Sequence, residues 1–353
     1  MSNVENFKCP NCGGLLHFDS NSQKLKCESC DGEFDPEFFE ENKEIKIENT
    51  KWDDDNEHLT FTCKMCGGSV YAHKDVVSLS CPYCGNPMVL QDNISNEYKP
   101  SRIIPFKLDK NKAKEEYFNH LKKKVLLPNT FKDEAIINEI KGIYVPYWLF
   151  GGNVSGKAWY DATKVRSWSD GSYHYTETSY YKLFRSCRVS FSDIPVDASS
   201  KIDDDLTQSI EPFDTKEMTS FNSNYLAGYC ADRYDVDEKT SQVTANSRIQ
   251  NTTRNLLDNS TAGFATLTPS NLDINISEGN QEYVMYPLWL LNVKYNDKNY
   301  QFVMNGQTGK FVGNLPMDKN ELFKILSLTF IGVLIVLTII QYIICLYIWK
   351  RYY

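Results

Sequence analysis

Arginine is missing from the amino-terminal quarter of this 353-residue chain, and the first one is Arg102. Residues 1–95 contain eight lysines against seventeen aspartates and glutamates, a net charge of −9 in a chain whose total is −8. Proteins bind DNA and RNA by neutralising phosphates with Lys and Arg, and they read guanine edges mainly with Arg. The amino-terminal part therefore lacks the charge pattern of a nucleic-acid-binding module.

Two further features are absent. Residues 1–30 contain no apolar segment like the core of a secretory signal peptide, so we expect the amino-terminal part to remain in the cytoplasm. The chain also has no phosphate-binding loop. Its nearest match, Asn305–Lys310, has Met304 and Phe311 at the positions that need glycine and Ser or Thr. The paired Asn-Gly and Thr-Gly instead predict a hairpin turn.

The cysteines that are present follow a strict pattern. Two CxxC pairs are separated by 14 residues, and the same unit returns 54 residues later. The eight cysteines are Cys9, Cys12, Cys27, Cys30, Cys63, Cys66, Cys81 and Cys84. A CxxC turn places two thiolates on one side of a knuckle, and a second knuckle completes a tetrahedral four-sulfur site. Gly13 and Gly85 allow the tight turn after the second cysteine.

This spacing predicts two zinc ribbons, each holding one structural Zn²⁺. Between the knuckles, residues 15–18 with 24–26, and 69–72 with 76–79, are expected to form short hairpins. Disulfides or a redox CxxC are the alternative, but a thioredoxin-like motif needs a βαβ context that the sequence lacks. Four sulfurs close the coordination sphere, so the metals are expected to stabilise the fold rather than to catalyse.

Ile325–Trp349 forms a run of 25 residues without a charge, followed by Lys350 and Arg351. About 20 apolar residues suffice to cross a bilayer, so the run predicts one transmembrane helix. Lys350 and Arg351 favour an inside carboxyl terminus, but Lys319 and Lys324 offset them. Metal-binding thiolates suit a reducing compartment. We therefore expect a single-pass protein of the cell membrane with its amino-terminal domains in the cytoplasm.

The middle of the chain, with 26 basic and 27 acidic residues, mixes helix and strand patterns. Helices are expected from an Asp109 cap to Lys124, from Lys132 to Lys141, and over Thr240–Asp258. Antiparallel strands are expected over Lys157–Phe191, with a turn at Asp170-Gly171, and over Tyr283–Val312. A Pro-x-Trp-Leu phrase occurs at Pro146 and again at Pro287, and its aromatics are expected in the core. No residue stands out as catalytic: Cys187 and Cys230 are lone thiols.

The expected architecture is multidomain: two small β zinc ribbons, an α+β domain with a mainly antiparallel sheet, and one carboxyl-terminal transmembrane helix. The predicted boundaries are 1–34 for the first ribbon, 35–58 for an acidic linker, 59–95 for the second ribbon, 96–317 for the α+β domain and 318–353 for the anchor, with its helix at about 325–349.

Several phrases make the chain similar to a bacterial family of membrane-anchored, TFIIB-type zinc-ribbon proteins. They are the four CxxC pairs, Ile104-Pro105-Phe106, Gly142–Leu149 and Asn305–Lys310 with Gly313–Pro316. The chain resembles in particular the zinc-ribbon membrane subunit encoded beside an SPFH-domain (flotillin-like) protein and a phage-shock protein A homologue in bacilli. That resemblance implies a membrane scaffold that recruits cytoplasmic partners during envelope stress.

These observations predict a non-enzymatic, membrane-anchored adaptor with two structural zinc ions. Its expected partners are the membrane itself and other proteins, such as an SPFH-domain protein or a second membrane subunit. The alternative is a membrane-tethered zinc-ribbon protein of transcription or replication that binds nucleic acid, against which the acidic charge argues.

Overall fold

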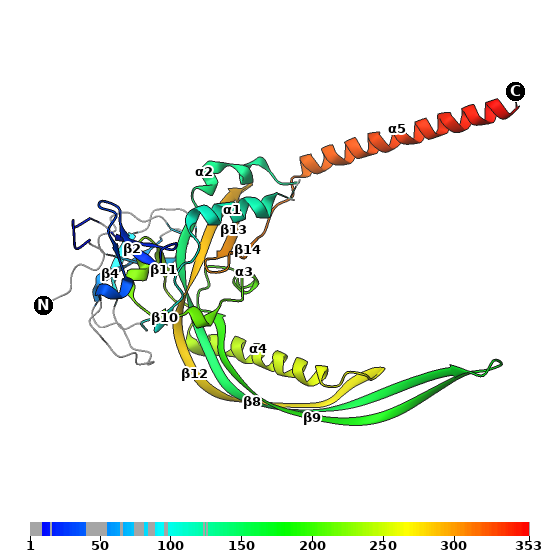
Figure 1. Ribbon diagram of the computed structural model, residues 1–353, viewed down its shortest axis with the longest axis horizontal. Coiled ribbons are helices and arrows are strands. Elements are labelled where there is room, and N and C mark those ends of the chain that lie inside the picture. Colours follow the sequence, from blue (N-terminus) through cyan, green and yellow to red (C-terminus); the bar gives the residue numbers. More distant parts are fainter. Residues whose placement is uncertain are drawn as a thin grey trace.

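The computed structural model describes residues 9–14, 16–39, 55–63, 66–73, 81–83, 89–94, 98–122, 124 and 126–352. Figure 1 shows how the parts of the chain are arranged. A cysteine-rich head lies at the amino-terminal end, and a β-sheet body follows it. From the body extend a long curved arm and one straight helix, both toward the side opposite the head.

The first ribbon is a three-stranded antiparallel sheet. It contains β1 (Leu16–Asp19), β2 (Lys24–Cys27) and β3 (Glu33–Phe34), and a short 3₁₀ turn, η1 (Pro36–Phe39), follows. Leu16 pairs with Cys27 and Asp19 with Lys24, so the hairpin predicted between the first two knuckles is present.

The second set of cysteines belongs to the large sheet of the body. Its strands are β4 (Asp55–Thr62), β5 (Ser69–His73) and β6 (Val89–Ile94), with β4 between the other two. β4 begins inside the segment expected to be a linker, and the strand expected at 76–79 lies outside the described residues. β5 pairs with β11 (Cys230–Asp232), which joins this half of the head to the body through backbone hydrogen bonds.

The body is built on a mainly antiparallel sheet of eleven strands in the described residues, counting the three just named. Its long strands are β8 (Lys141–Ser169), β9 (His174–Asp197) and β12 (Thr266–Tyr295), and β8 lies between the other two. The short strands are β7 (Arg102–Ile103), β10 (Thr219–Ser220), β11, β13 (Lys298–Asn305) and β14 (Phe311–Gly313). Among the described strands, only the β11–β8 and β12–β7 pairs are parallel.

Two of the three helices predicted for the middle domain are present. α1 (Lys110–Leu121) is capped by Asp109, whose Oδ1 accepts from the Lys112 N–H at 2.8 Å, and its apolar face is buried as expected. α4 (Glu238–Asn259) contains the predicted helix 240–258. Shorter helical elements are α3 (Asp204–Ser209) and the 3₁₀ turns η3 (Thr215–Glu217) and η4 (Ser223–Leu226).

The helix predicted from Lys132 to Lys141 is wrong. The 3₁₀ turn η2 (Asn129–Lys132) comes first, α2 covers only Glu134–Ile137, and β8 has begun by Lys141. Ile137 and Ile140 are buried in the core, so this short segment packs as a connection into the sheet. Sheet pairing here outweighs a weak local helix preference.

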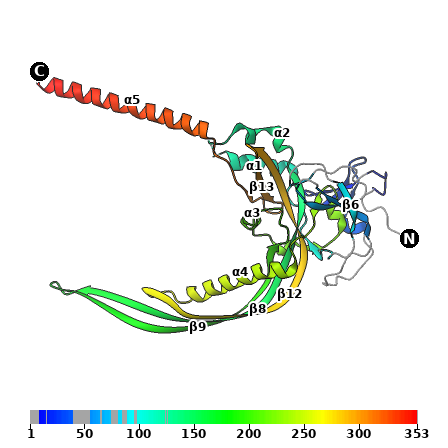
Figure 2. The same cartoon turned by 180° about the vertical axis from the view of Figure 1, so that it is seen from behind.

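The arm consists of the parts of the long strands β8, β9 and β12 that extend beyond the body. β8 has 29 residues, of which Ile143–Phe150 are all buried, whereas strands usually have about 3–10 residues. From Val154 to Ala162 every second residue is buried, because α4 covers one face of the arm. β8 and β9 turn at Asp170-Gly171, as predicted, and Gly171 has a φ of +91°. Figure 2 shows α4 lying along the arm.

The two Pro-x-Trp-Leu phrases are neighbours in the sheet. Pro146 on β8 pairs with Met285 on β12, and Pro287 pairs with Tyr144. Trp148 and Trp289 are both buried, and their indole N–H groups donate to the backbone oxygens of Val236 and Leu108. The prediction that these aromatics form the core is therefore confirmed.

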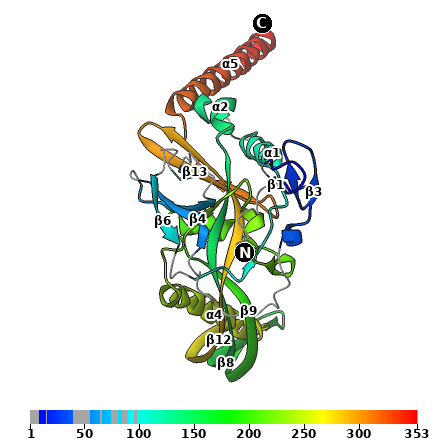
Figure 3. The ribbon, with the colours of Figure 1, turned by 90° about the vertical axis from the view of Figure 1, so that its left-hand side faces the viewer.

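The carboxyl-terminal helix α5 (Lys319–Tyr352) extends away from the body (Figures 1 and 3). Its segment Glu321–Ile344 is long and apolar enough to cross a membrane, and none of it is buried against the rest of the protein. Among the described residues it is the one helix with these properties.

Candidate metal centres

The first ribbon brings four sulfurs together. The ligand atoms of Cys9, Cys12, Cys27 and Cys30 all lie within 4.8 Å of one another, and the Cys9–Cys30 and Cys12–Cys27 Sγ distances are both 3.5 Å. A tetrahedron with Zn–S bonds of about 2.3 Å has edges of about 3.8 Å, whereas a disulfide needs about 2.05 Å. The donor set and its spacing therefore fit a metal ion and do not fit disulfides.

The backbone of each knuckle is closed by short-range hydrogen bonds. The Gly13 N–H donates to Cys9 O at 2.8 Å, and Gly13 has a φ of +71°, which explains the glycine predicted there. At the second knuckle Asp31 takes the same place with a φ of +54°. The Ser29 N–H donates to Cys27 Sγ at 3.4 Å, the kind of contact that stabilises a thiolate.

The thiols of the first group differ in acidity. Desolvation opposes ionisation of Cys27, but the N–H groups of Ser29 and Cys30 and the neighbouring thiols lower its pKa to about 7. At Cys30 the Gly32 N–H lowers the pKa, but the Cys12 and Cys9 thiols outweigh it and raise the pKa to about 12. Cys27 is thus the more easily ionised of these two thiols, and a bound cation would stabilise the other thiols of the group in ionised form.

The second group repeats this arrangement. The sulfur atoms of Cys63, Cys66 and Cys81 lie within 4.8 Å of one another, and Cys66 Sγ is 3.5 Å from Cys81 Sγ. Gly67 has a φ of +71° and donates to Cys63 O at 2.9 Å, as Gly13 does to Cys9. Cys84 and Gly85 lie outside the described residues. These two cysteine-rich groups could each hold a metal ion.

In the three pairs whose two cysteines are both described, the first cysteine is buried and the second is exposed. Cys9, Cys27, Cys63 and Cys81 are buried, whereas Cys12, Cys30 and Cys66 are exposed. In these three knuckles the first cysteine therefore packs into the protein and the second faces solvent.

The first ribbon is attached to the loop that follows β10. The side-chain amides of Asn222 and Asn224, both buried, donate to Pro36 O at 3.0 and 2.7 Å. The Phe18 N–H donates to Ala227 O at 3.0 Å, and the Phe18 and Tyr225 rings meet edge to face at 5.1 Å. No sequence pattern indicated these two asparagines, because their shared partner lies about 190 residues away.

The second ribbon is attached to the body at its last described knuckle. Lys141 Nζ donates to Cys81 O at 3.4 Å, and the Asn292 side chain donates to Pro82 O at 2.7 Å. Next to this knuckle Tyr83 is buried over Gly68, where an added Cβ would lie 2.9 Å from the tyrosine ring. Rotation of the second ribbon against the body would break these contacts.

A buried carboxyl group lies beside this attachment. Desolvation raises the pKa of Asp232 to about 7, although the Ser199 hydroxyl donates to its Oδ2 at 2.5 Å. Asp237 caps α4 through the Thr240 N–H at 2.8 Å, and Asp235 binds Ser200. These contacts give all three acids structural roles.

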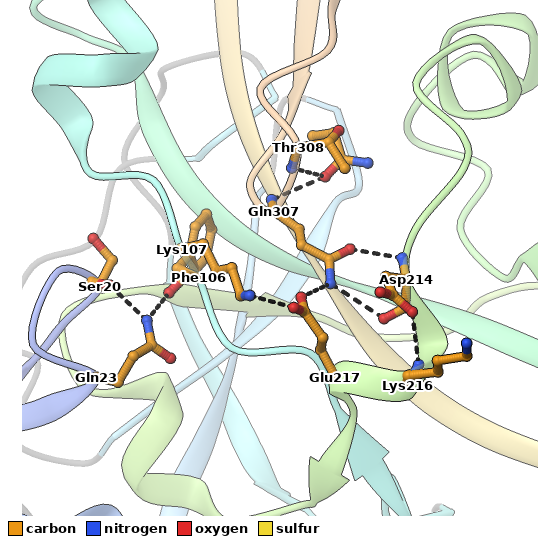
Figure 4. A network of polar contacts seen from close by, with 10 residues as sticks. Ser20, Gln23, Phe106, Lys107, Asp214, Lys216, Glu217, Gln307 and Thr308 are labelled. Atoms are coloured by element: carbon orange, nitrogen blue, oxygen red, sulfur yellow. Dashed lines mark hydrogen bonds and ion pairs between the residues drawn. The ribbon is translucent and has the colours of Figure 1, made fainter.

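The Asn305–Lys310 turn, excluded above as a nucleotide loop, is filled by protein contacts (Figure 4). Gln307 Oε1 accepts from the Asp214 N–H at 2.8 Å, and its Nε2 donates to Asp214 O and to Glu217. Lys107 forms an ion pair with Glu217. The Gly309 N–H donates to Asn305 O at 2.9 Å and closes the predicted hairpin turn between β13 and β14.

Neither of the two lone thiols, Cys187 and Cys230, belongs to a metal group. Cys187 is half-buried in the contact between β9 and α4, where its Sγ would lie 3.1 Å from a Cβ added at Gly156. Burial raises the pKa of Cys230 to about 11, so this thiol stays protonated near neutral pH. His17 is 3.8 Å from Glu28 and is not part of the cysteine group. The side chain of His73 lies outside the described residues.

No known protein-family model matches the chain. No solved structure matches it either. The chain is similar to "Uncharacterized protein YdjG" of Bacillus subtilis (strain 168), with 29% identity over 319 residues, which cover 90% of this chain and 92% of the relative. The similarity thus covers nine-tenths of the chain, and it connects the chain to a distant homologue in a bacillus.

Proposed function

We propose that the protein is a non-enzymatic adaptor of the cell membrane. It crosses the membrane once with α5, keeps its head and body in the cytoplasm, and docks partner proteins there. The observation that carries the proposal is the exposure of α5: none of its apolar segment Glu321–Ile344 is buried in the part of the protein that the structure describes. An apolar helix of this length is stable in a bilayer and unfavourable in water.

The head is proposed to hold two structural Zn²⁺ ions, with Cys84 completing the second site. Four sulfurs in a closed tetrahedral arrangement are typical of structural zinc. When bound, zinc would neutralise thiolates and hold the knuckles in place. The head would still carry about −13 in formal charge, counting −2 for each four-thiolate zinc site and −9 for residues 1–95. A surface of this charge favours basic protein partners over nucleic acid.

The proposed partners follow from the resemblance to membrane-anchored zinc-ribbon proteins of bacilli. They are an SPFH-domain protein or a second membrane subunit, in a response to envelope stress. Similarity to a Bacillus subtilis protein over nine-tenths of the chain supports this comparison with proteins of bacilli. The firm attachment of both ribbons to the body supports an adaptor in which head and anchor move as one unit.

Crosslinking in native membranes tests the adaptor role. The parent chain is compared with a Cys9→Ser/Cys63→Ser variant and with Cys187→Ser, whose thiol lies outside the metal groups. The proposal expects a crosslinked partner with the parent and with Cys187→Ser, and its loss from the double variant. Identical crosslinks in all three proteins, or DNA binding by the full chain at low salt, would count against it.

Labelling of a new surface cysteine tests the orientation. Lys239 at the start of α4 is exposed, so Lys239→Cys offers an accessible thiol on the body. An impermeant maleimide is expected to react only after intact cells are permeabilised. Reaction with intact cells would reverse the proposed topology.

A further inference from the structure

Exposed aromatic side chains gather at the free end of the arm. The distal arm, defined here as residues 159–184, has seven aromatic side chains that are more than a third exposed: Trp159, Trp168, Tyr173, Tyr175, Tyr180, Tyr181 and Phe184. Outside the distal arm and α5, the described residues include only one such side chain, Phe118 at 37%. Exposed apolar groups concentrated in this way mark a contact surface.

These rings are held in place by the hairpin. Trp168 and Tyr175 pair across β8 and β9 and stack at 5.5 Å with an interplanar angle of 15°. On the opposite face Trp159 and Phe184 pair at 5.1 Å. Tyr180, 81% exposed, lies on that same face, four residue pairs nearer the tip. Both faces of the tip therefore carry exposed aromatic side chains. α4 ends at Asn259 and does not extend over the tip.

The charge of the hairpin is opposite to that of the chain. Residues 157–188 contain six basic and three acidic side chains, a net charge of +3 in a chain of −8. The distal arm itself has three of each sign, so the excess of positive charge comes from Lys157, Arg185 and Arg188 at its base. One of the basic groups, Arg166, lies with its guanidinium 5.4 Å from the Trp168 ring. Aromatic and basic side chains together are the composition that favours the headgroup region of a bilayer with anionic lipids.

The arm and α5 extend toward the same side of the molecule. Figures 1 and 2 show the hairpin tip curving to the side toward which α5 runs, away from the cysteine-rich head. The Asp318 N–H donates to Leu126 O at 2.8 Å, which fixes the base of α5 to the body. Six helical residues separate this base from Ile325, so the body lies within about 10 Å of the hydrocarbon. At about 3.3 Å per residue, the arm from Asn153 to Ser169 reaches on the order of 50 Å.

We propose that the distal arm rests in the interfacial layer of the membrane that α5 crosses, as a second attachment of the body to lipid. This inference rests on the proposed anchoring by α5. The contact is shallow, because the open edges of a two-stranded hairpin need water for their free N–H and C=O groups. Trp168, Tyr173 and Tyr180 place their rings among the headgroups, and α5 and the arm together fix how far the head stands from the bilayer.

Fluorine NMR of the full chain tests the proposal. The protein is labelled with 5-fluorotryptophan and placed in nanodiscs of phosphatidylcholine and phosphatidylglycerol, with and without a lipid carrying gadolinium at its headgroup. Trp168→Phe and Trp349→Phe identify two of the resonances. We expect the gadolinium lipid to broaden the Trp168 and Trp349 resonances at least fivefold and to leave those of the buried Trp148 and Trp289 nearly unchanged.

The outcomes separate the two claims. Broadening of Trp349 without Trp168 would overturn the arm contact and leave the anchor standing, whereas broadening of neither would remove both. Broadening of Trp168 only by a gadolinium label on a second copy of the chain would assign the tip to a protein contact and overturn the proposal. Tyr173→Ser/Tyr180→Ser is expected to reduce the Trp168 broadening at least threefold, and Ser155→Ala near the arm base is expected to leave it unchanged.

Discussion

Tyr147 on β8 and Tyr286 on β12 stack with their ring centroids 4.4 Å apart and an interplanar angle of 25°. Both rings are fully buried where the two long strands pair. Within the described part of the chain the Tyr286 hydroxyl has no hydrogen-bond partner, and burial raises the pKa of both tyrosines. Tyr286 thus stabilises the body through ring packing and not through its hydroxyl.

Substitutions at Tyr286 separate these two contributions. Tyr286→Phe removes an unpaired buried hydroxyl and keeps the ring, so it is expected to change the free energy of unfolding by less than about 1 kcal/mol. Tyr286→Ala removes the ring and is expected to cost about 3–5 kcal/mol. Thermal unfolding of the full chain in detergent, followed by near-ultraviolet circular dichroism, measures both. A large loss with Tyr286→Phe would show that the hydroxyl has a partner that matters.

Metal content distinguishes the two cysteine groups. The purified full chain is expected to hold two zinc ions, and Cys9→Ser or Cys63→Ser is expected to lose one each, because each group supplies its own ligands. Elemental analysis by mass spectrometry gives the ratio. Cys187→Ser serves as the control and is expected to retain both ions. One zinc in the parent chain, or loss of both ions from a single substitution, would contradict two independent sites.

Asp232 makes the stability of the body depend on pH. Its folded pKa, raised by desolvation to about 7, lies above the ordinary aspartate value of 3.8, so between these values the folded state binds more protons than the unfolded state. Stability contributed by the protonated carboxyl is present at low pH and is lost as the pH rises toward 7. Asp232→Asn removes this loss, so the variant is expected to gain about 2 kcal/mol on the parent between pH 5.5 and 7.5.

Chemical unfolding at the two pH values measures this difference. Asp161→Asn is the matched control, because Asp161 is exposed on the arm and is expected to give the same change as the parent. A constant difference between Asp232→Asn and the parent across this range would show that the carboxyl is already ionised in the folded protein at pH 5.5.

The features predicted from the sequence were those fixed by local chemistry. The four-residue knuckles, the Asp109 cap and the Asp170-Gly171 turn each depend on a few neighbouring residues, and the structure contains them. The three described cysteines of the second group also lie together as the 54-residue repeat indicated.

The features that were not predicted depend on distant partners. β8 continues unbroken from Lys141 to Ser169 because β12 and β9 pair with it on both sides, which no local pattern indicates. The same pairing shortened the helix expected at Lys132–Lys141. The attachment of β5 to β11 likewise joins residues about 160 positions apart.

Alkaline extraction of native membranes tests the central claim, that α5 anchors this metal-binding chain in a bilayer, most directly. The account predicts that the full chain stays in the membrane pellet after carbonate washing, and that Val333→Lys/Leu337→Lys moves it to the supernatant, because each lysine at the helix centre costs about 3 kcal/mol. Release of the parent chain into the supernatant under the same conditions would contradict the account.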